Sequence, residues 1–267
     1  VAKQLESWRG CRVPWHAGIP NFARVTVFNR AGKSRGHLRA WDWDAVCFNP
    51  ALMLHGQPTP GATMLRADRE AVVANTPVSA GETVACRWPD LAHLAQAIAD
   101  AEKAGATGVA IFRLPGEGSQ GGWSLEQLGR LLRERKPGDP QFRLQAVSDR
   151  LELMNVSAMD LVPRLAGEAG ALDRGWQLEI ESSAGAVFRE ASAGEFANVF
   201  GHIEPDGAEP KRVAIPLAQR LTYWFADLRA GKSRQSGLLQ FAPGVDTKSL
   251  RWRIPNSPTN HQWQTVD

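Results

Sequence analysis

The stretch "TGVAIFRLPGEGSQGGWSLEQLGRLLRER", residues 107–135, bears most directly on the fold of this chain. Its first nine residues form a nearly continuous apolar run. Such a run predicts a strand that is buried on both faces, as in a parallel sheet covered by helices. Residues 124–135 follow with helical spacing, and Ser124 and Gln127 predict a capping box at the start of that helix. A strand followed by a helix is typical of one βα unit.

Three glycines, Gly116, Gly118 and Gly121, lie between this strand and helix at G-x-G-x-x-G spacing. In a dinucleotide-binding loop the helix begins within the glycine run, so that its N-terminus faces the pyrophosphate. Here the capping box places the helix start later, at Ser124. The acidic strand end expected about twenty residues further on is replaced by the proline-rich segment 136–141. We therefore predict an ordinary βα loop and no bound cofactor.

The loop after the strand is also a candidate ligand site, because βα loops carry the functional residues in βα folds. Arg113, Glu117 and Trp123 lie in or beside it, and we predict them as ligand-binding candidates. The alternative is structural. In it Arg113 forms a salt bridge, Glu117 is a solvated loop residue, and Trp123 belongs to the core or its rim.

The residues before this stretch alternate strand-like and helical patterns. "FARVTVF" (22–28) predicts a strand, and residues 44–50 predict a second short one. "DLAHLAQAIADAEKAG" (90–105) has apolar residues at steps of three and four, which predicts a helix with Asp90 as its N-cap. This alternation predicts an α/β region over residues 1–138.

The segment "KPGDPQ" (136–141) marks a change of pattern. Many short runs after it alternate apolar and polar residues with period two, which is typical of an antiparallel sheet with one buried face. We predict a β-sandwich-like domain over residues 139–267, with a loose polar tail after Pro255. The predicted strands are 142–147, 150–156, 176–182, 186–191, 211–217, 221–228, 237–243 and 250–255.

The motif "GATGVAIFRLP…GGWSLEQL" resembles the last strand and helix of a bacterial family of extracytoplasmic, TIM-barrel-like proteins of unknown function. That family is similar in fold to glycoside hydrolases. The resemblance implies that residues 1–138 are the C-terminal part of a (β/α) barrel, that the β domain is accessory, and that the protein acts in the periplasm or at the cell surface. The matching residues are Gly108, Val109, Phe112, Arg113, Leu114, Pro115, Trp123, Ser124 and Leu125.

The acidic motif of that family lies in the first half of its barrel, and this chain resembles only the later part. The resemblance therefore implies that the chain is not catalytically complete. It also implies that an upstream half-barrel, or a larger assembly, supplies the rest of the barrel.

The motif "WDWD" (41–44) is the most conspicuous local feature. In a strand, Trp41 and Trp43 would share one face and Asp42 and Asp44 the other. The tryptophans are then candidates for stacking on a glycan, and the two aspartates are candidates for the acid and base of glycoside cleavage. The alternative is that the tryptophans cover the core and the aspartates are solvated. Catalysis is disfavoured, because neighbouring residues on one strand rarely reach both sides of a scissile bond.

Composition excludes several classes of partner. The net charge is only +3, from 31 basic and 28 acidic residues of mixed order, which argues against nucleic-acid binding. No apolar run is long enough to predict a membrane span. The histidines lack the i, i+4 spacing of a metal pair, so we predict no metal. Cys11, Cys47 and Cys86 can form one disulfide with a spare thiol or stay reduced.

The sequence thus leaves two functions open. One is a carbohydrate-related protein with a glycosidase-like barrel and an accessory β domain. The other is a non-enzymatic structural or binding subunit that docks on a larger assembly through its β domain. A second acidic cluster at strand ends would favour the first function, and none is visible in the sequence.

Overall fold

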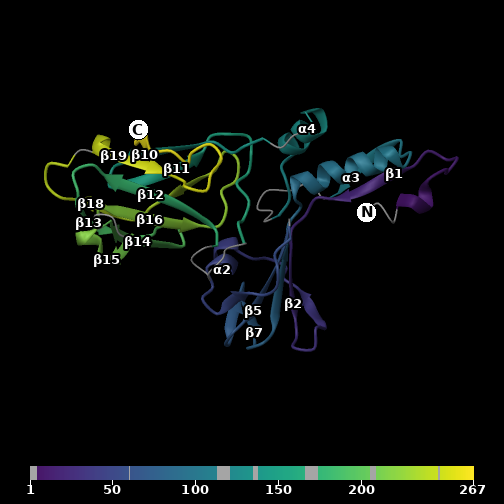
Figure 1. The fold of residues 1–267 in the computed structure, drawn as a ribbon, viewed down its shortest axis with the longest axis horizontal. Coiled ribbons are helices and arrows are strands. Elements are labelled where there is room, and N and C mark those ends of the chain that lie inside the picture. The colour runs from purple at the N-terminus through teal and green to yellow at the C-terminus, as the bar shows by residue number, and fades with distance from the viewer. Residues whose placement is uncertain are drawn as a thin grey trace. The chain divides into compact units, whose positions relative to one another are not determined.

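The computed structural model describes residues 5–59, 61–112, 121–134, 138–165, 174–204, 209–245 and 247–267 (Figure 1). The chain divides into two units. Unit 1 comprises Val1–Asp42 and Asn49–Gly138, and unit 2 comprises Trp43–Phe48 and Asp139–Asp267. The short segment 43–48 therefore belongs with the C-terminal part of the chain, although unit 1 surrounds it in sequence.

A five-stranded antiparallel sheet with the order β3-β2-β8-β5-β4 forms the centre of unit 1. Along β5 every second residue is buried, which is the pattern of a sheet with one covered face. A separate hairpin turns at Ala74 and Asn75, which both have positive φ, as tight hairpin turns require. The strands are β2 (Arg24–Phe28), β3 (Ser34–His37), β4 (Leu52–Leu54), β5 (Ala62–Ala67) and β8 (Thr83–Arg87), with the hairpin β6 (Ala71–Val73) and β7 (Thr76–Val78).

The rest of unit 1 contains a parallel strand pair and two helices. Their bounds are β1 (His16–Pro20), β9 (Gly108–Phe112), α3 (Leu91–Lys103) and α4 (Leu125–Glu134), after a short 3-10 turn η1 (Glu6–Trp8).

Both predicted helix starts are confirmed. The Asp90 carboxylate accepts the His93 N–H at 2.9 Å. The Ser124 hydroxyl accepts the Gln127 N–H, and the Gln127 side chain accepts the Ser124 N–H. These contacts satisfy backbone donors that the first helical turn cannot pair.

The prediction of a partial (β/α) barrel is wrong. Over the described ranges the chain has three α-helices, several small sheets that are mostly antiparallel, and no closed barrel. The strand predicted at 22–28 pairs antiparallel with β3 and β8, where a barrel strand would pair in parallel with its neighbours. The predicted double-sided burial of the strand at 107–115 also fails, because Phe112 is half exposed.

Unit 2 contains a six-stranded sheet with the order β15-β14-β16-β12-β19-β20, a three-stranded sheet and a two-stranded pair. The six strands are β12 (Trp176–Ser182), β14 (Asn198–Ile203), β15 (Lys211–Val213), β16 (Arg220–Phe225), β19 (Leu250–Arg253) and β20 (Gln264–Thr265). The other elements are β10 (Phe142–Val147), β11 (Arg150–Asn155), β17 (Ser233–Gln235), β13 (Phe188–Ala191), β18 (Leu239–Phe241), α2 (Trp43–Cys47), η3 (Ile215–Leu217) and η4 (Thr247–Ser249).

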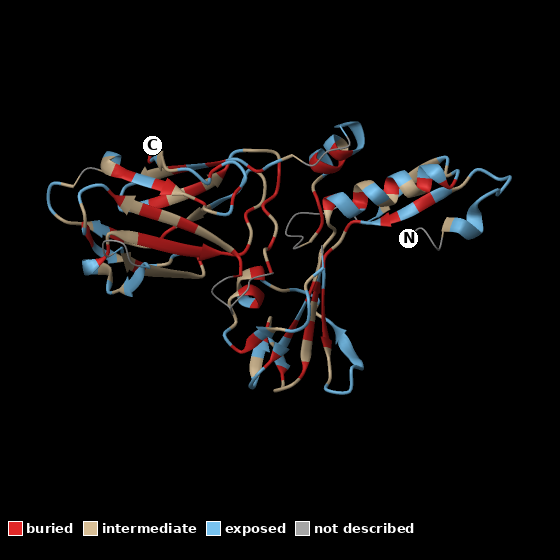
Figure 2. Cartoon of the chain, viewed as in Figure 1, coloured by how far each residue is buried: buried red, intermediate tan, exposed pale blue. Residues whose placement is uncertain are grey.

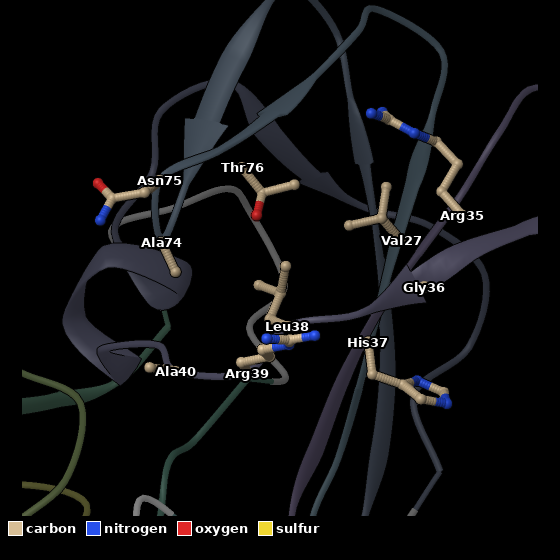
Figure 3. A pocket seen from close by; sticks show the side chains of 10 residues that line it. All are labelled: Val27, Arg35, Gly36, His37, Leu38, Arg39, Ala40, Ala74, Asn75 and Thr76. Carbon is tan, nitrogen blue, oxygen red and sulfur yellow. The ribbon is translucent and has the colours of Figure 1, made fainter.

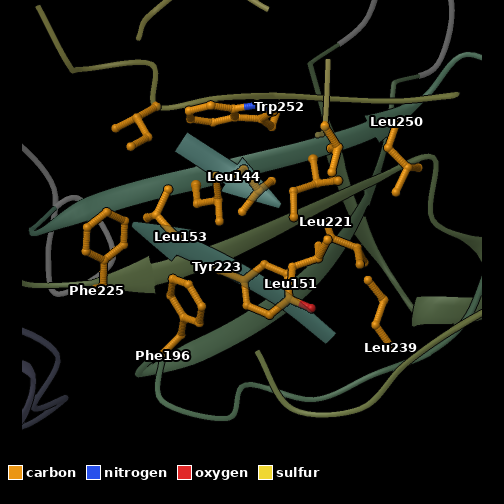
Figure 4. Close-up of a cluster of buried hydrophobic side chains, with 14 of the residues drawn as sticks. Leu144, Leu151, Leu153, Phe196, Leu221, Tyr223, Phe225, Leu239, Leu250 and Trp252 are labelled. Atoms are coloured by element: carbon orange, nitrogen blue, oxygen red, sulfur yellow. The ribbon is translucent and has the colours of Figure 1, made fainter. Parts of the chain in front are cut away.

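One hydrophobic core joins the sheets of unit 2, as the buried residues in Figure 2 and the side chains in Figure 4 show. Leu144 and Leu153 come from the three-stranded sheet, whereas Leu178, Tyr223 and Trp252 come from the six-stranded one. Burying each such side chain stabilises the fold by about 1.5–3 kcal/mol. The term β-sandwich-like fits this unit only loosely, because its strands form sheets of six, three and two.

The residues after Pro255 differ from the loose tail that their polar composition predicts. β20 pairs with β19, and Val266 is buried in the core. The Trp252 indole N–H donates to the Thr265 carbonyl at 3.1 Å, and the Asp267 N–H donates to the Leu144 carbonyl. A few anchoring contacts therefore fix a segment whose average polarity is high. Within the described residues, no helix is both long and apolar enough for a membrane span.

Candidate functional site

The "WDWD" motif is not a strand. Trp43 begins the short helix α2, which also replaces the strand predicted at 44–50. Trp43 is buried, Trp41 is half-buried, and Asp42 is exposed. Trp43 therefore presents no face for stacking on a glycan, and the two tryptophans belong to different units: Trp41 to unit 1 and Trp43 to unit 2.

Asp44 holds α2 within unit 2. Its carboxylate accepts the Ala226 N–H at 2.6 Å and a hydrogen bond from Arg234. Arg234 in turn forms an ion pair with Asp227 at 3.2 Å. Burial raises the pKa of the Asp227 carboxyl, and Arg234 and Arg229 oppose that rise. The Asp44 carboxylate is thus occupied by structural partners, and the sequence-based role as an acid or base stays a prediction without geometric support.

Trp123 is part of the unit 1 core. Its backbone N–H and carbonyl both bond to the Asn21 side chain, and its indole N–H donates to the Pro89 carbonyl. A Cβ on the nearby Gly121 would clash with Ala23, so there is no room for a side chain at position 121.

The predicted site residues are divided between the two units. Trp41, Asp42 and Trp123 lie in unit 1, whereas Trp43 and Asp44 lie in unit 2. Arg113 and Glu117 lie outside the described residues, as do Gly116 and Gly118 of the glycine-rich loop.

A different set of functional side chains lies on the face of the six-stranded sheet opposite the core, here called the outer face. Strand register places His202, Arg220, Glu181 and Arg251 in one row across four strands. Paired residues on neighbouring strands point to the same side of a sheet. The next row holds Phe200, Thr222, Glu179 and Arg253.

Ion pairs link these two rows. Arg220 contacts Glu204 at 2.7 Å and Glu181 at 3.3 Å, with Glu179 at 3.9 Å. Arg253 pairs with Glu179 at 2.7 Å. The Arg220 side chain is only 11% exposed, so the network is largely shielded from water. Charged groups that are shielded and paired on several sides hold fixed positions.

Aromatic rings flank the network at both ends. The Trp263 ring lies under the Arg253 guanidinium at 4.4 Å, which is a cation–π geometry. On the other side Phe200 and Trp224 meet edge to face with ring centroids 5.0 Å apart. The Trp263 ring also lies 5.4 Å from the Arg220 guanidinium and 5.7 Å from that of Arg251.

A cavity of about 290 Å³ opens at the first of these rows. The side chains that define it come from β12, β14, β16, β19 and the segments beside them. Those used below are Glu181, His202, Glu204, Gln219, Arg220 and Arg251.

His202 faces this cavity as a neutral imidazole at neutral pH. Burial lowers the pKa of His202, Arg220 and Arg212 lower it further, and Glu179 opposes them. The His202 Nε2 and the Arg220 Nε have no hydrogen-bond partner in the part of the chain that the structure describes. Both atoms are buried, so they lie behind the cavity surface and a ligand in the cavity does not reach them.

Sequence reasoning did not identify these residues as a site. The alternation in "WQLEIES" and "LRWRIP" does place Glu179, Glu181, Arg251 and Arg253 on polar faces of predicted strands. It does not say which strands are neighbours, and β14, which carries His202, was not predicted.

Nothing in the described ranges gathers three metal-binding side chains into a possible metal site. Cys11 is exposed, Cys47 and Cys86 are buried, and all three are thiols. Comparisons with protein-family models, curated proteins and solved structures find no match for this chain.

Proposed function

We propose that unit 2 is a non-enzymatic binding module that takes a neutral glycan in the cavity of the outer face. The observation that carries the proposal is the composition of that cavity. Its walls combine two arginines with two glutamates, beside a neutral histidine and an amide.

The balance of charge favours a ligand that is polar and uncharged. Arg220 and Arg251 each form an ion pair with a glutamate that lines the same cavity. Their positive charges are therefore balanced, which weakens their attraction for an anionic ligand. A sugar hydroxyl both donates and accepts hydrogen bonds. It can therefore accept from a guanidinium and donate to a carboxylate without separating the pair.

Order in the wall favours binding, because a site that is already fixed loses little entropy when the ligand arrives. Arg220 is held by three carboxylates, and Glu181 is held by both Arg220 and Arg251. A cavity of this size is at the lower end of ligand sites, roughly 300–1,000 Å³, and suits one or two sugar rings.

The same geometry disfavours hydrolysis. Glycoside cleavage uses two carboxyl groups on opposite sides of the scissile bond. Here Glu181 and Glu204 both contact the Nη2 atom of Arg220, so one guanidinium occupies the space between them. The unit therefore supplies hydrogen bonds rather than an acid and a base.

The test is calorimetry of the full chain with neutral oligosaccharides, after a glycan array has selected the best ligand. We expect the variant Glu204→Gln to bind that ligand about tenfold more weakly, because it weakens hydrogen bonds to a charged acceptor. Glu204 is half exposed, so its replacement leaves the fold intact.

The matched control is Glu190→Gln, an exposed glutamate on β13 outside the cavity, which should bind normally. Absence of binding to every neutral glycan, or stronger binding to acidic or basic oligosaccharides, would contradict the proposal.

A further inference from the structure

Unit 1 contains a second cavity, of about 420 Å³, that none of the predicted site residues line. It lies beside β3, the segment 38–40 that follows it, and the turn of the β6–β7 hairpin (Figure 3). The residues that carry the argument are Val27, Arg35, His37, Leu38, Arg39 and Thr76.

We propose that this cavity binds a small organic acid, with its carboxylate on Arg39 and its apolar body against Val27 and Leu38. The described residues that line the cavity include two arginines and a histidine, and none of them is acidic. A basic lining without a carboxylate favours an anion.

Arg35 and Arg39 have different roles in this arrangement. Arg35 pairs with the buried Glu82 and donates to the Pro77 carbonyl at 3.1 Å, so its charge is balanced and its position is fixed. Arg39 forms no ion pair with any described residue. Its guanidinium can therefore give both of its parallel N–H bonds to a carboxylate, which is the geometry that arginine binds best.

Two further polar side chains, His37 and Thr76, line the cavity. The His37 Nδ1 lies 2.7 Å from the Thr26 hydroxyl, which fixes the orientation of the histidine ring. Figure 3 shows the Thr76 hydroxyl oxygen turned towards Leu38. A hydroxyl that lines the cavity can donate to a further lone pair of a carboxylate oxygen.

The apolar residues of the cavity indicate the chemistry of the part of the ligand that is not the carboxylate. Val27 is almost fully buried, Leu38 is half-buried, and Ala40 and Ala74 add small apolar surfaces. Apolar walls with a few convergent polar groups are typical of sites for small organic molecules. An inorganic anion would leave these walls without contacts, so the lining favours an acid that carries a hydrocarbon body.

The test uses isotope-labelled full chain and titrates benzoate, hexanoate, inorganic phosphate and benzamide separately, while backbone amide shifts are recorded. We expect benzoate and hexanoate to shift amides 35–40 and 74–76 with saturation at millimolar concentration. Benzamide has the same ring without the charge and should bind at least about tenfold more weakly. Phosphate binding as tight as benzoate binding would overturn the role of the apolar wall.

Variants locate the binding. Arg39→Gln should weaken benzoate binding at least about tenfold, because it removes the charged donor of the hydrogen bonds to the carboxylate. The matched control is Arg66→Gln, an exposed arginine on β5 of the same sheet but outside the cavity, which should bind normally. Unchanged affinity in Arg39→Gln, or no saturable binding of either acid, would overturn the proposal. Neither outcome depends on glycan binding by unit 2.

Discussion

Single side chains in unit 2 differ sharply in how well their polar groups are paired. The Tyr223 ring packs in the core against Phe196, with centroids 5.0 Å apart, while its hydroxyl has no hydrogen-bond partner among the residues described. The nearby Ser236 hydroxyl already donates to the Gly237 carbonyl and accepts the Leu151 N–H. Burial raises the pKa of Tyr223, and the Ser236 side chain opposes that rise only in part, so the phenol stays neutral.

We expect Tyr223→Phe to leave the free energy of unfolding within about 1 kcal/mol of the original, or to raise it, because it removes a buried hydroxyl that gains no bond. Chemical denaturation measures this difference. Tyr223→Leu is the control, since it also removes the ring contact with Phe196 and should cost more. A loss above about 2 kcal/mol in the phenylalanine variant would reveal a hydrogen bond to the hydroxyl.

His202 makes stability depend on pH. Its pKa in the folded chain is lower than the ordinary value of about 6.5. Between those two pKa values the unfolded chain binds more protons than the folded one, so the free energy of unfolding falls as pH falls below about 6.5. Replacement by glutamine should reduce this fall, whereas His261→Gln, at an exposed position, should not. Denaturation curves at several pH values measure both, and parallel curves for all three proteins would contradict the prediction.

At the scale of elements, the sequence predicts helices that local contacts define, such as α3 and α4, but not the helix α2, whose contacts are with residues far away in the sequence. The starts of α3 and α4 depend on side chains three residues from the groups they cap, so a short window of sequence contains the whole signal. Asp44 in the first turn of α2 instead contacts Ala226 and Arg234, which lie 182 and 190 residues away. No local pattern contains that information, and the motif was predicted as a strand.

We expect Asp44→Ala to lower the free energy of unfolding of unit 2 by on the order of 3 kcal/mol, because it leaves Arg234 without that carboxylate and the Ala226 N–H unpaired. Asp44→Asn keeps an acceptor for Ala226 and should cost less. Hydrogen exchange of the α2 amides and denaturation measure the effect. Asp149→Ala, an exposed acid of the same unit, should change little. Equal stability of Asp44→Ala and Asp149→Ala would exclude the anchoring role.

At the scale of the whole molecule, the sequence predicted that the second half is rich in strands but not which strands are neighbours. Arg220 is 39 residues from Glu181, and Arg251 is 70 residues from it, yet the three side chains form one row. The polar face of each strand could be predicted from its alternation, while the site required the order β14-β16-β12-β19. The barrel prediction is wrong because the motif at 107–125 does not determine how the earlier strands pair, and those strands form an antiparallel sheet.

The position of α2 also has a consequence in time. A ribosome makes this helix first and its partners Ala226 and Arg234 about 180 residues later. At a translation rate of roughly 5–20 residues per second, α2 is synthesised on the order of 10–40 s before the strand against which it packs. Throughout that interval Trp43, which is buried in the finished protein, has no completed unit 2 to enter. It is then an apolar target for a chaperone, and the speed of translation sets how long that target is available.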